Sequence, residues 1–157
     1  MSIYLDHNNL NGPNLSELRN LLWGNNRIKM LSVWGCNIGN EGAISIAEGY
    51  VRNSSVTHLY LRDNHISDLA GAELLNGLLF ERKVPIEVLD ISYNMLKEKS
   101  GEVLVHMLPK LKNPPSKICL AYNLLETHKY KILHLFTMKK IHSDDFEKFQ
   151  VEKRKTK

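Results

Sequence analysis

Side chains that could take part in acid–base, nucleophilic or metal chemistry are scattered along this 157-residue chain. The sequence has no G-x-x-x-x-G-K, G-x-S-x-G, H-E-x-x-H or C-x-x-C motif. Cys119 has only Lys117 as a close basic neighbour, so a small thiol that fills a strand position is the favoured interpretation. Asp90 and Tyr60 could act as an acid–base pair only inside a closed pocket. The sequence therefore predicts no enzyme activity, no metal site and no cofactor.

A short aliphatic pattern, which must position all of these side chains, recurs five times along the chain. Around Asn64 it is Val56-x-x-Leu59-x-Leu61-x-x-Asn64-x-Ile66. The polar position recurs at Asn8, Cys36, Asn64, Asn94 and Asn123, in steps of 28, 28, 30 and 29 residues. A period of this length indicates a stacked array, and L-x-x-L-x-L-x-x-N/C-x-L is the signature of the leucine-rich repeat.

Each repeat is predicted to form a strand followed by a helix. Leu59 and Leu61 alternate with polar residues, as in a half-buried strand. An asparagine amide both donates and accepts, so it can satisfy backbone groups where the chain turns inward after the strand. The five residues at the polar position are predicted to form a structural ladder, with the thiol of Cys36 as a substitute.

The predicted fold class is α/β, a leucine-rich-repeat solenoid shaped as a short curved horseshoe, with five parallel strands on the concave face and helices on the convex face. Residues 1–140 form the repeat domain, and residues 141–157 form a charged, partly disordered tail. The strands are expected near residues 2–6, 30–34, 58–62, 88–92 and 117–121.

The repeats resemble those of the ribonuclease-inhibitor-like subfamily, because they are 28 to 30 residues long and carry a full helix. The stretch Ile38-Gly-Asn-Glu-Gly-Ala43 is similar to that subfamily's strand-to-helix passage, and residues 66–71 and 96–101 are similar with one extra residue. The resemblance implies binding to another protein. It leaves open a regulator of a partner enzyme, of the GTPase-activating kind, or the recognition part of a bacterial effector or immune-type sensor.

The strand register gives the predicted partner-binding face. Trp, Tyr and Arg dominate protein-binding hot spots. The candidate residues are Tyr4, Trp34, His58, Tyr60, Arg62, Asp63, Asp90, Tyr93 and Tyr122. Arg62 is expected within stacking reach of Trp34 and close enough to Asp90 to pair with it, and Tyr93 beside Tyr122. His7 and His58 would lie about 10 Å apart, too far to share a metal.

Charge and composition restrict the class of partner and the cellular location that we expect. The net charge is +4, but the sheet face sets Asp6, Asp63 and Asp90 against Arg62 and Lys117, so nucleic acid is disfavoured. No apolar run reaches the roughly 18 residues of a membrane span, and the N-terminus does not read as a secretory signal. Two cysteines are too few for a disulfide framework, so a cytoplasmic location is predicted. For a chain from an intracellular bacterium, this extends to delivery into a host cell.

The array begins directly on a strand at its N-terminal edge. A solenoid normally shields its first repeat with a polar cap, because a bare strand invites pairing with another chain. The sequence therefore predicts either further repeats upstream or self-association at this edge.

Overall fold

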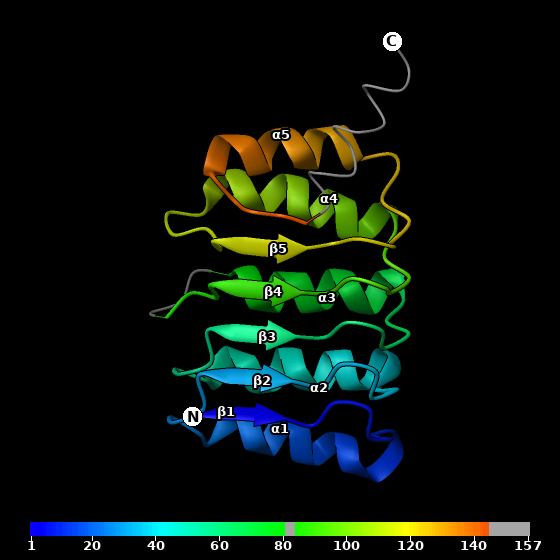
Figure 1. The fold of residues 1–157 in the computed structure, drawn as a ribbon, viewed down its shortest axis with the longest axis vertical. Coiled ribbons are helices and arrows are strands. Elements are labelled where there is room, and N and C mark those ends of the chain that lie inside the picture. Colours follow the sequence, from blue (N-terminus) through cyan, green and yellow to red (C-terminus); the bar gives the residue numbers. More distant parts are fainter. Residues whose placement is uncertain (81–83, 145–157) are drawn as a thin grey trace.

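In the computed structural model, which describes residues 1–80 and 84–144, strands and helices alternate along the chain. The strands are β1 (Ser2–Tyr4), β2 (Met30–Ser32), β3 (His58–Tyr60), β4 (Val88–Asp90) and β5 (Lys117–Cys119). The helices are α1 (Leu15–Trp23), α2 (Gly39–Arg52), α3 (Asp68–Leu79), α4 (Glu98–Met107) and α5 (Lys129–Lys139), with short 3-10 turns at Gly12–Asn14 and Leu108–Lys110. The strands lie side by side in one layer and the helices form a second layer behind them (Figure 1).

Within the described residues the strands form one parallel sheet in the order β1-β2-β3-β4-β5. Each strand pairs with the next at the same point of the repeat, so Leu31 pairs with Leu59 and Leu59 with Leu89. The predicted fold class is confirmed, since strands that alternate with helices in a single parallel sheet make a short solenoid. The strands occupy the first three residues of each expected range.

The core lies between the sheet and the helices. The middle residue of each strand points toward the helices, and Leu31, Leu59 and Leu89 are fully buried. The helices contribute equally buried side chains from their inner faces, including Leu22 of α1 and Leu74 of α3. Burying a leucine side chain is worth about 1.5–3 kcal/mol, so each repeat is stabilised chiefly by the neighbours on which it stacks.

One glycine of the strand-to-helix passage is required by close packing. A Cβ atom on Gly71 would overlap Leu96 Cδ2 and approach Ser100 Oγ at 3.0 Å, both in the next repeat. The absence of a side chain at this point lets α3 and the following passage come together.

Asn64 joins two repeats through its side-chain amide. Its Oδ1 accepts hydrogen bonds from the backbone N–H groups of Cys36 (3.0 Å) and Ile38 (3.3 Å) in the preceding repeat. Its Nδ2 donates to the carbonyl of Val33 at 2.8 Å and to that of Arg62 at 3.2 Å. The side chain is fully buried, so these bonds satisfy backbone groups that lie away from solvent.

The same exchange recurs along the array. Asn94 accepts from the N–H groups of Asn64 and Ile66 and donates to the Leu61 carbonyl at 3.0 Å. Asn123 accepts from Leu96 N–H at 3.0 Å and donates to the Ile91 carbonyl at 2.9 Å. Each repeat is thus fixed to the one before it by hydrogen bonds to the backbone.

Two further asparagines, Asn25 and Asn53, stabilise the turns that lead from a helix to the next strand. The repeat pattern did not predict this role. Asn53 donates to the carbonyls of Leu22 (2.7 Å) and Asn25 (2.9 Å) and accepts from the N–H groups of Ser55 and Val56. Asn25 accepts from the N–H groups of two residues that follow it. Asn25 and Asn53 lie one repeat length apart, and that spacing was the available signal.

Asp68 caps the helix of the next repeat. Its carboxylate accepts hydrogen bonds from the backbone N–H groups of Lys97 (2.7 Å), Lys99 (2.9 Å) and Ser100 (3.0 Å) at the start of α4. Burial opposes ionisation, but these donors outweigh it and lower the pKa of Asp68. A carboxylate at a helix N-terminus also interacts favourably with the helix dipole.

The two ends of the stack differ. At the C-terminal end α5 covers the last repeat, and its Ile132 and Phe136 are buried together with Ile141. His142 then pairs with the outer edge of β5, accepting from Ile118 N–H and donating to the Ser116 carbonyl. At the other end β1 is the edge strand of the described sheet.

Replacing Asn64 with alanine is expected to lower the free energy of unfolding by more than about 2 kcal/mol. The substitution leaves the N–H groups of Cys36 and Ile38 and the carbonyl of Val33 without their partner, and each such buried group costs about 1–3 kcal/mol. Chemical denaturation followed by circular dichroism measures the change. Asn8→Ala is the matched control, because Asn8 is exposed and bonds only carbonyls of its own turn. Equal losses in the two variants would contradict this account of the ladder.

Replacing Asp68 with asparagine is expected to destabilise the protein by about 0.3–1 kcal/mol at pH 7, the typical value of a negative charge at a helix N-terminus. Because the folded-state pKa of Asp68 is lowered, its contribution is complete above the unfolded pKa of about 3.9 and is lost as the pH falls through the folded value. Urea denaturation of both proteins from pH 7 downward should therefore show their difference shrinking in acid. Asp63→Asn, at an exposed carboxylate, should show little difference at any pH.

Candidate functional site

The face of the sheet that points away from the helices carries alternate strand residues. Tyr4 is 65% exposed at the edge, while His58 and Tyr60 on β3 are half-buried. Ser32 and Ser92 also belong to this face but are covered by larger neighbours. We call this surface the open sheet face.

A continuous row of planar groups crosses the open sheet face, with one residue from each repeat. The rings of His7 and Trp34 lie 4.7 Å apart between centroids, tilted by 58°. Arg62 Cζ lies 5.3 Å from the centroid of the Trp34 ring and 4.0 Å from that of the Tyr93 ring. Tyr93 stacks on Tyr122 at 4.0 Å with an interplanar angle of 27°. We call these five residues the ring row.

The backbone directs three of these side chains. The residue before each ladder position has left-handed dihedrals, with φ between 54° and 63°, at His7, Gly35, Asp63, Tyr93 and Tyr122. A residue other than glycine pays about 1–3 kcal/mol for a sparsely populated conformation of this kind, which persists only where the surroundings impose it. The ladder hydrogen bonds impose it here, and they thereby place Tyr93 and Tyr122 in neighbouring repeats side by side.

Gly35 makes room for the first member of the ring row. A Cβ atom at this position would lie 2.7 Å from His7 Nδ1 and 3.1 Å from His7 Cε1. In the second repeat, therefore, Trp34 rather than the residue that follows it supplies the ring.

The acidic side chains near the ring row are held by donors of the protein itself. Asp6 Oδ1 accepts from Ser32 Oγ and from Trp34 N–H at 2.9 Å. Asp90 Oδ1 accepts from the N–H of Ser92 at 3.0 Å and from its hydroxyl at 2.6 Å. The expected pairing of Asp90 with Arg62 is not among the ion pairs of residues 1–80 and 84–144, because Ser92 engages the carboxylate and the rings hold the guanidinium.

Tyr60 and Tyr93 have pKa values above the ordinary range of tyrosine. Burial raises the pKa of Tyr60, and the nearby charge of Lys117 opposes that shift. The hydrogen bond with Tyr122 raises the pKa of Tyr93, while Arg62 acts in the other direction. Both phenols are therefore neutral near pH 7, and the surface they offer is aromatic rather than charged.

A turn after α5 covers one end of the open sheet face. Asp144 pairs with Lys117 at 3.0 Å and accepts a hydrogen bond from Cys119 Sγ at 3.5 Å. Burial, followed by the charges of Asp90 and Asp144, raises the pKa of Cys119 to about 12. Within the described part of the chain, no group of three or more His, Cys, Asp or Glu residues could hold a metal ion.

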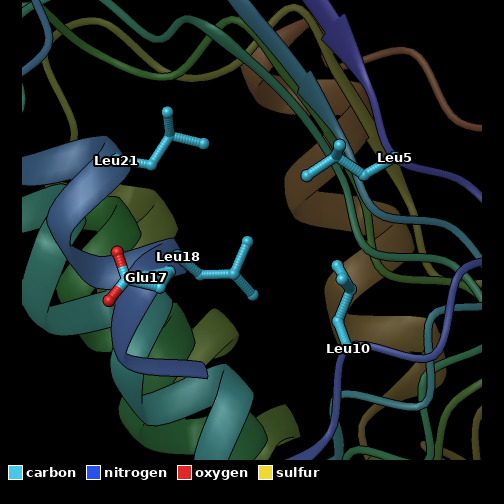
Figure 2. Close-up of a pocket in the computed structure, with 5 residues that line it drawn as sticks. All are labelled: Leu5, Leu10, Glu17, Leu18 and Leu21. Carbon is cyan, nitrogen blue, oxygen red and sulfur yellow. The ribbon is translucent and has the colours of Figure 1, made fainter. Parts of the chain in front are cut away.

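A cavity of about 400 Å³ opens at the other end of the stack, beside β1. Figure 2 shows Leu5 and Leu10 on one side of it facing Leu18 and Leu21 of α1. Glu17 is the one ionisable residue of its lining. The cavity is the uncovered end of the hydrophobic core, and its apolar walls offer no acid–base or nucleophilic group opposite Glu17.

The structure brings Trp34, Arg62, Tyr93 and Tyr122 together in the ring row. Of the other candidate residues, Tyr4 lies on β1, His58 and Tyr60 on β3 and Asp90 on β4, and exposed Asp63 follows Arg62. His7 was not among the candidates, although it completes the row. His7 could have been identified from its sequence position, because it directly precedes a ladder residue, as Tyr93 and Tyr122 do.

Comparison with known proteins agrees with this architecture. The family model described as "Leucine Rich repeat" matches residues 25–47 and 52–75, which are parts of the second and third repeats. A search of curated proteins found no match. Residues 25–47 and 52–75 are therefore similar to leucine-rich repeats, and the parallel array is consistent with a short solenoid of such repeats. Domains of this class are generally protein-binding modules and are typically non-catalytic. None of the helices in the described ranges is long and apolar enough to cross a membrane.

The thiols of the native protein are expected to react very slowly with Ellman's reagent. At pH 8 a thiol of pKa about 12 is ionised to about 1 part in 10⁴, against roughly a quarter for an unfolded cysteine of pKa about 8.5. Cys36 is also buried, and burial raises its pKa. The reaction at Cys119 should be about 10³-fold slower in buffer than in denaturing urea, and the absorbance at 412 nm reports the sum of both thiols. Rapid labelling of Cys119 in buffer, mapped by mass spectrometry, would contradict the burial described here.

Proposed function

We propose that this protein is a non-catalytic interaction module that binds a partner protein through the open sheet face. The ring row is the observation that carries the proposal. It runs from repeat to repeat along the segments that directly follow the strands. It combines Trp34, Arg62 and two tyrosines, the residue types that dominate binding hot spots.

The partial exposure of the row supports this proposal. Trp34 is 39% exposed, Tyr93 37% and Tyr122 60%. Rings that are held in place yet open to solvent lose little conformational entropy when a partner covers them. Aromatic side chains of this kind provide large contact areas.

The charges of the face favour a protein over a nucleic acid. Arg62 and Lys117 are accompanied by Asp6, Asp63, Asp90 and Asp144. Lys117 already pairs with Asp144, so few cations remain to neutralise a row of phosphates.

We also propose that the repeats belong to the ribonuclease-inhibitor-like subfamily. Repeats of 28 to 30 residues support this assignment, as do the full helices of 14 and 12 residues in α2 and α3. The close packing at Gly71 gives a structural reason for the glycine of the strand-to-helix passage.

Replacing Trp34 with alanine is expected to weaken partner binding by about 1–3 kcal/mol without unfolding the array. Tyr60→Ala is expected to weaken partner binding by a similar amount, because Tyr60 lies on β3, beside the strand that precedes Trp34. Affinity capture with the immobilised chain, followed by mass spectrometry, finds the proteins that bind the wild type, and titration of each with the variants measures the loss.

Trp23→Ala is the matched control. Trp23 is 47% exposed, and Arg52 lies over its ring at 4.4 Å, so the side chain resembles Trp34 in exposure and stacking. It lies at the end of α1, in the helical layer. A captured protein that loses affinity for Trp34→Ala but not for Trp23→Ala binds as proposed. Equal affinity for wild type, Trp34→Ala and Tyr60→Ala would show that the partner binds elsewhere.

A further inference from the structure

Arg62 is the permanently charged member of the ring row and lies at its centre. A ring from the repeat on each side contacts its guanidinium, Trp34 at 5.3 Å and Tyr93 at 4.0 Å. Tyr93 is itself held by its stack on Tyr122. Cation–π contacts of this kind are attractive, so the guanidinium is positioned before any partner arrives.

This arrangement favours hydrogen bonding in the plane of the guanidinium. An arginine carries five N–H donors in that plane. Tyr93 shares a side-chain hydrogen bond with Arg62, and its single phenol oxygen cannot engage all five donors. An arginine that is already ordered loses less rotamer entropy on binding. The geometry suits a planar acceptor, and a carboxylate can accept two parallel N–H bonds from one guanidinium.

Arg62 forms no ion pair with the carboxylates of the described residues. Among residues 1–80 and 84–144, no carboxylate lies within ion-pair distance of it. Three acids of the same face have other partners, because Asp6 and Asp90 accept bonds from serine and backbone donors and Asp144 pairs with Lys117.

We propose that Arg62 determines the specificity of the open sheet face by binding one aspartate or glutamate side chain of the partner protein, flanked by apolar and basic residues. This inference rests on the proposed function. Trp34 and the two tyrosines offer ring surface to apolar side chains. The charges of Asp63 and Asp90 disfavour a second acid beside the first and favour basic neighbours.

The test uses a library of random peptides displayed on phage and selected on the immobilised wild-type chain. The selected peptides should contain a single Asp or Glu among apolar and basic residues. Each is synthesised with its acid and with the corresponding amide, Asn or Gln, and titrated by fluorescence anisotropy. The acid form should bind wild type about 10- to 100-fold more tightly than the amide form, because hydrogen bonds to charged groups are worth about 1.5–3 kcal/mol.

The ratio of the dissociation constants of the amide and acid peptides tests whether Arg62 is the residue that binds the acid. In Arg62→Gln the acid and amide forms should bind equally, and in Arg62→Lys the ratio should be intermediate, because the charge remains but the planar fork is lost. Arg52→Gln is the matched control, since Arg52 also lies over a tryptophan but in the helical layer. It should leave the ratio as in wild type. Thermal unfolding of each variant verifies that the array is folded.

The outcomes separate this inference from the function on which it rests. Selected peptides that lack an acid, and that bind the Trp34→Ala variant more weakly than the wild type, would contradict the role of Arg62. They would still support binding at the open sheet face. A full acid-to-amide ratio in Arg62→Gln would overturn that role as well. Peptides that bind Trp34→Ala and Arg62→Gln as well as wild type, or no enrichment on the wild-type chain, would count against both proposals.

Discussion

The fold depends on satisfying the backbone where each strand ends and the chain turns toward the helices. These N–H and carbonyl groups are buried, and each would cost about 1–3 kcal/mol if left unpaired. The amide of Asn64 serves the preceding repeat as acceptor and donor, and the amide of Asn94 serves the repeat of Asn64 in turn. A repeat that slid along its neighbour would lose all of these bonds together, so the ladder fixes the register of the sheet.

Cys36 replaces the ladder asparagine in the second repeat and makes some of the hydrogen bonds that an asparagine makes in the later repeats. Its thiol donates to the Leu5 carbonyl at 3.0 Å. Burial raises the pKa of this thiol, while backbone N–H groups of Asn8 and His7 in the first repeat act on the sulfur in the direction that lowers its pKa. The Leu10 N–H also donates to the Cys36 carbonyl at 2.9 Å. Asn8 is exposed, so water can serve groups of this first turn. A thiol is therefore a sufficient substitute for the amide at the end of the stack, where the turn is not buried.

Sequence periodicity predicted the register and, through it, much of the open sheet face. Equal positions in successive repeats must be neighbours in a parallel array, and this alone places Arg62 beside Trp34 and Tyr93 beside Tyr122. Periodicity contains no backbone dihedrals, so it did not show that His7 would be turned onto Trp34. Periodicity also does not show which of several possible partners a side chain will bond. The carboxylate of Asp90 was expected to pair with Arg62, but it accepts a hydrogen bond from Ser92 instead.

The same internal pairing explains why this surface favours recognition over chemistry. Catalysis requires polar groups that are poised to exchange protons or electrons with a substrate in a closed pocket. On the open sheet face Asp6, Asp90 and Lys117 already have internal partners, and the pKa of Cys119 is raised far above neutrality. What remains available is the surface of the rings and the edge of one guanidinium. Under the function and the specificity that we propose, a partner gains affinity from the rings by covering them, and it gains specificity by presenting an acceptor to Arg62.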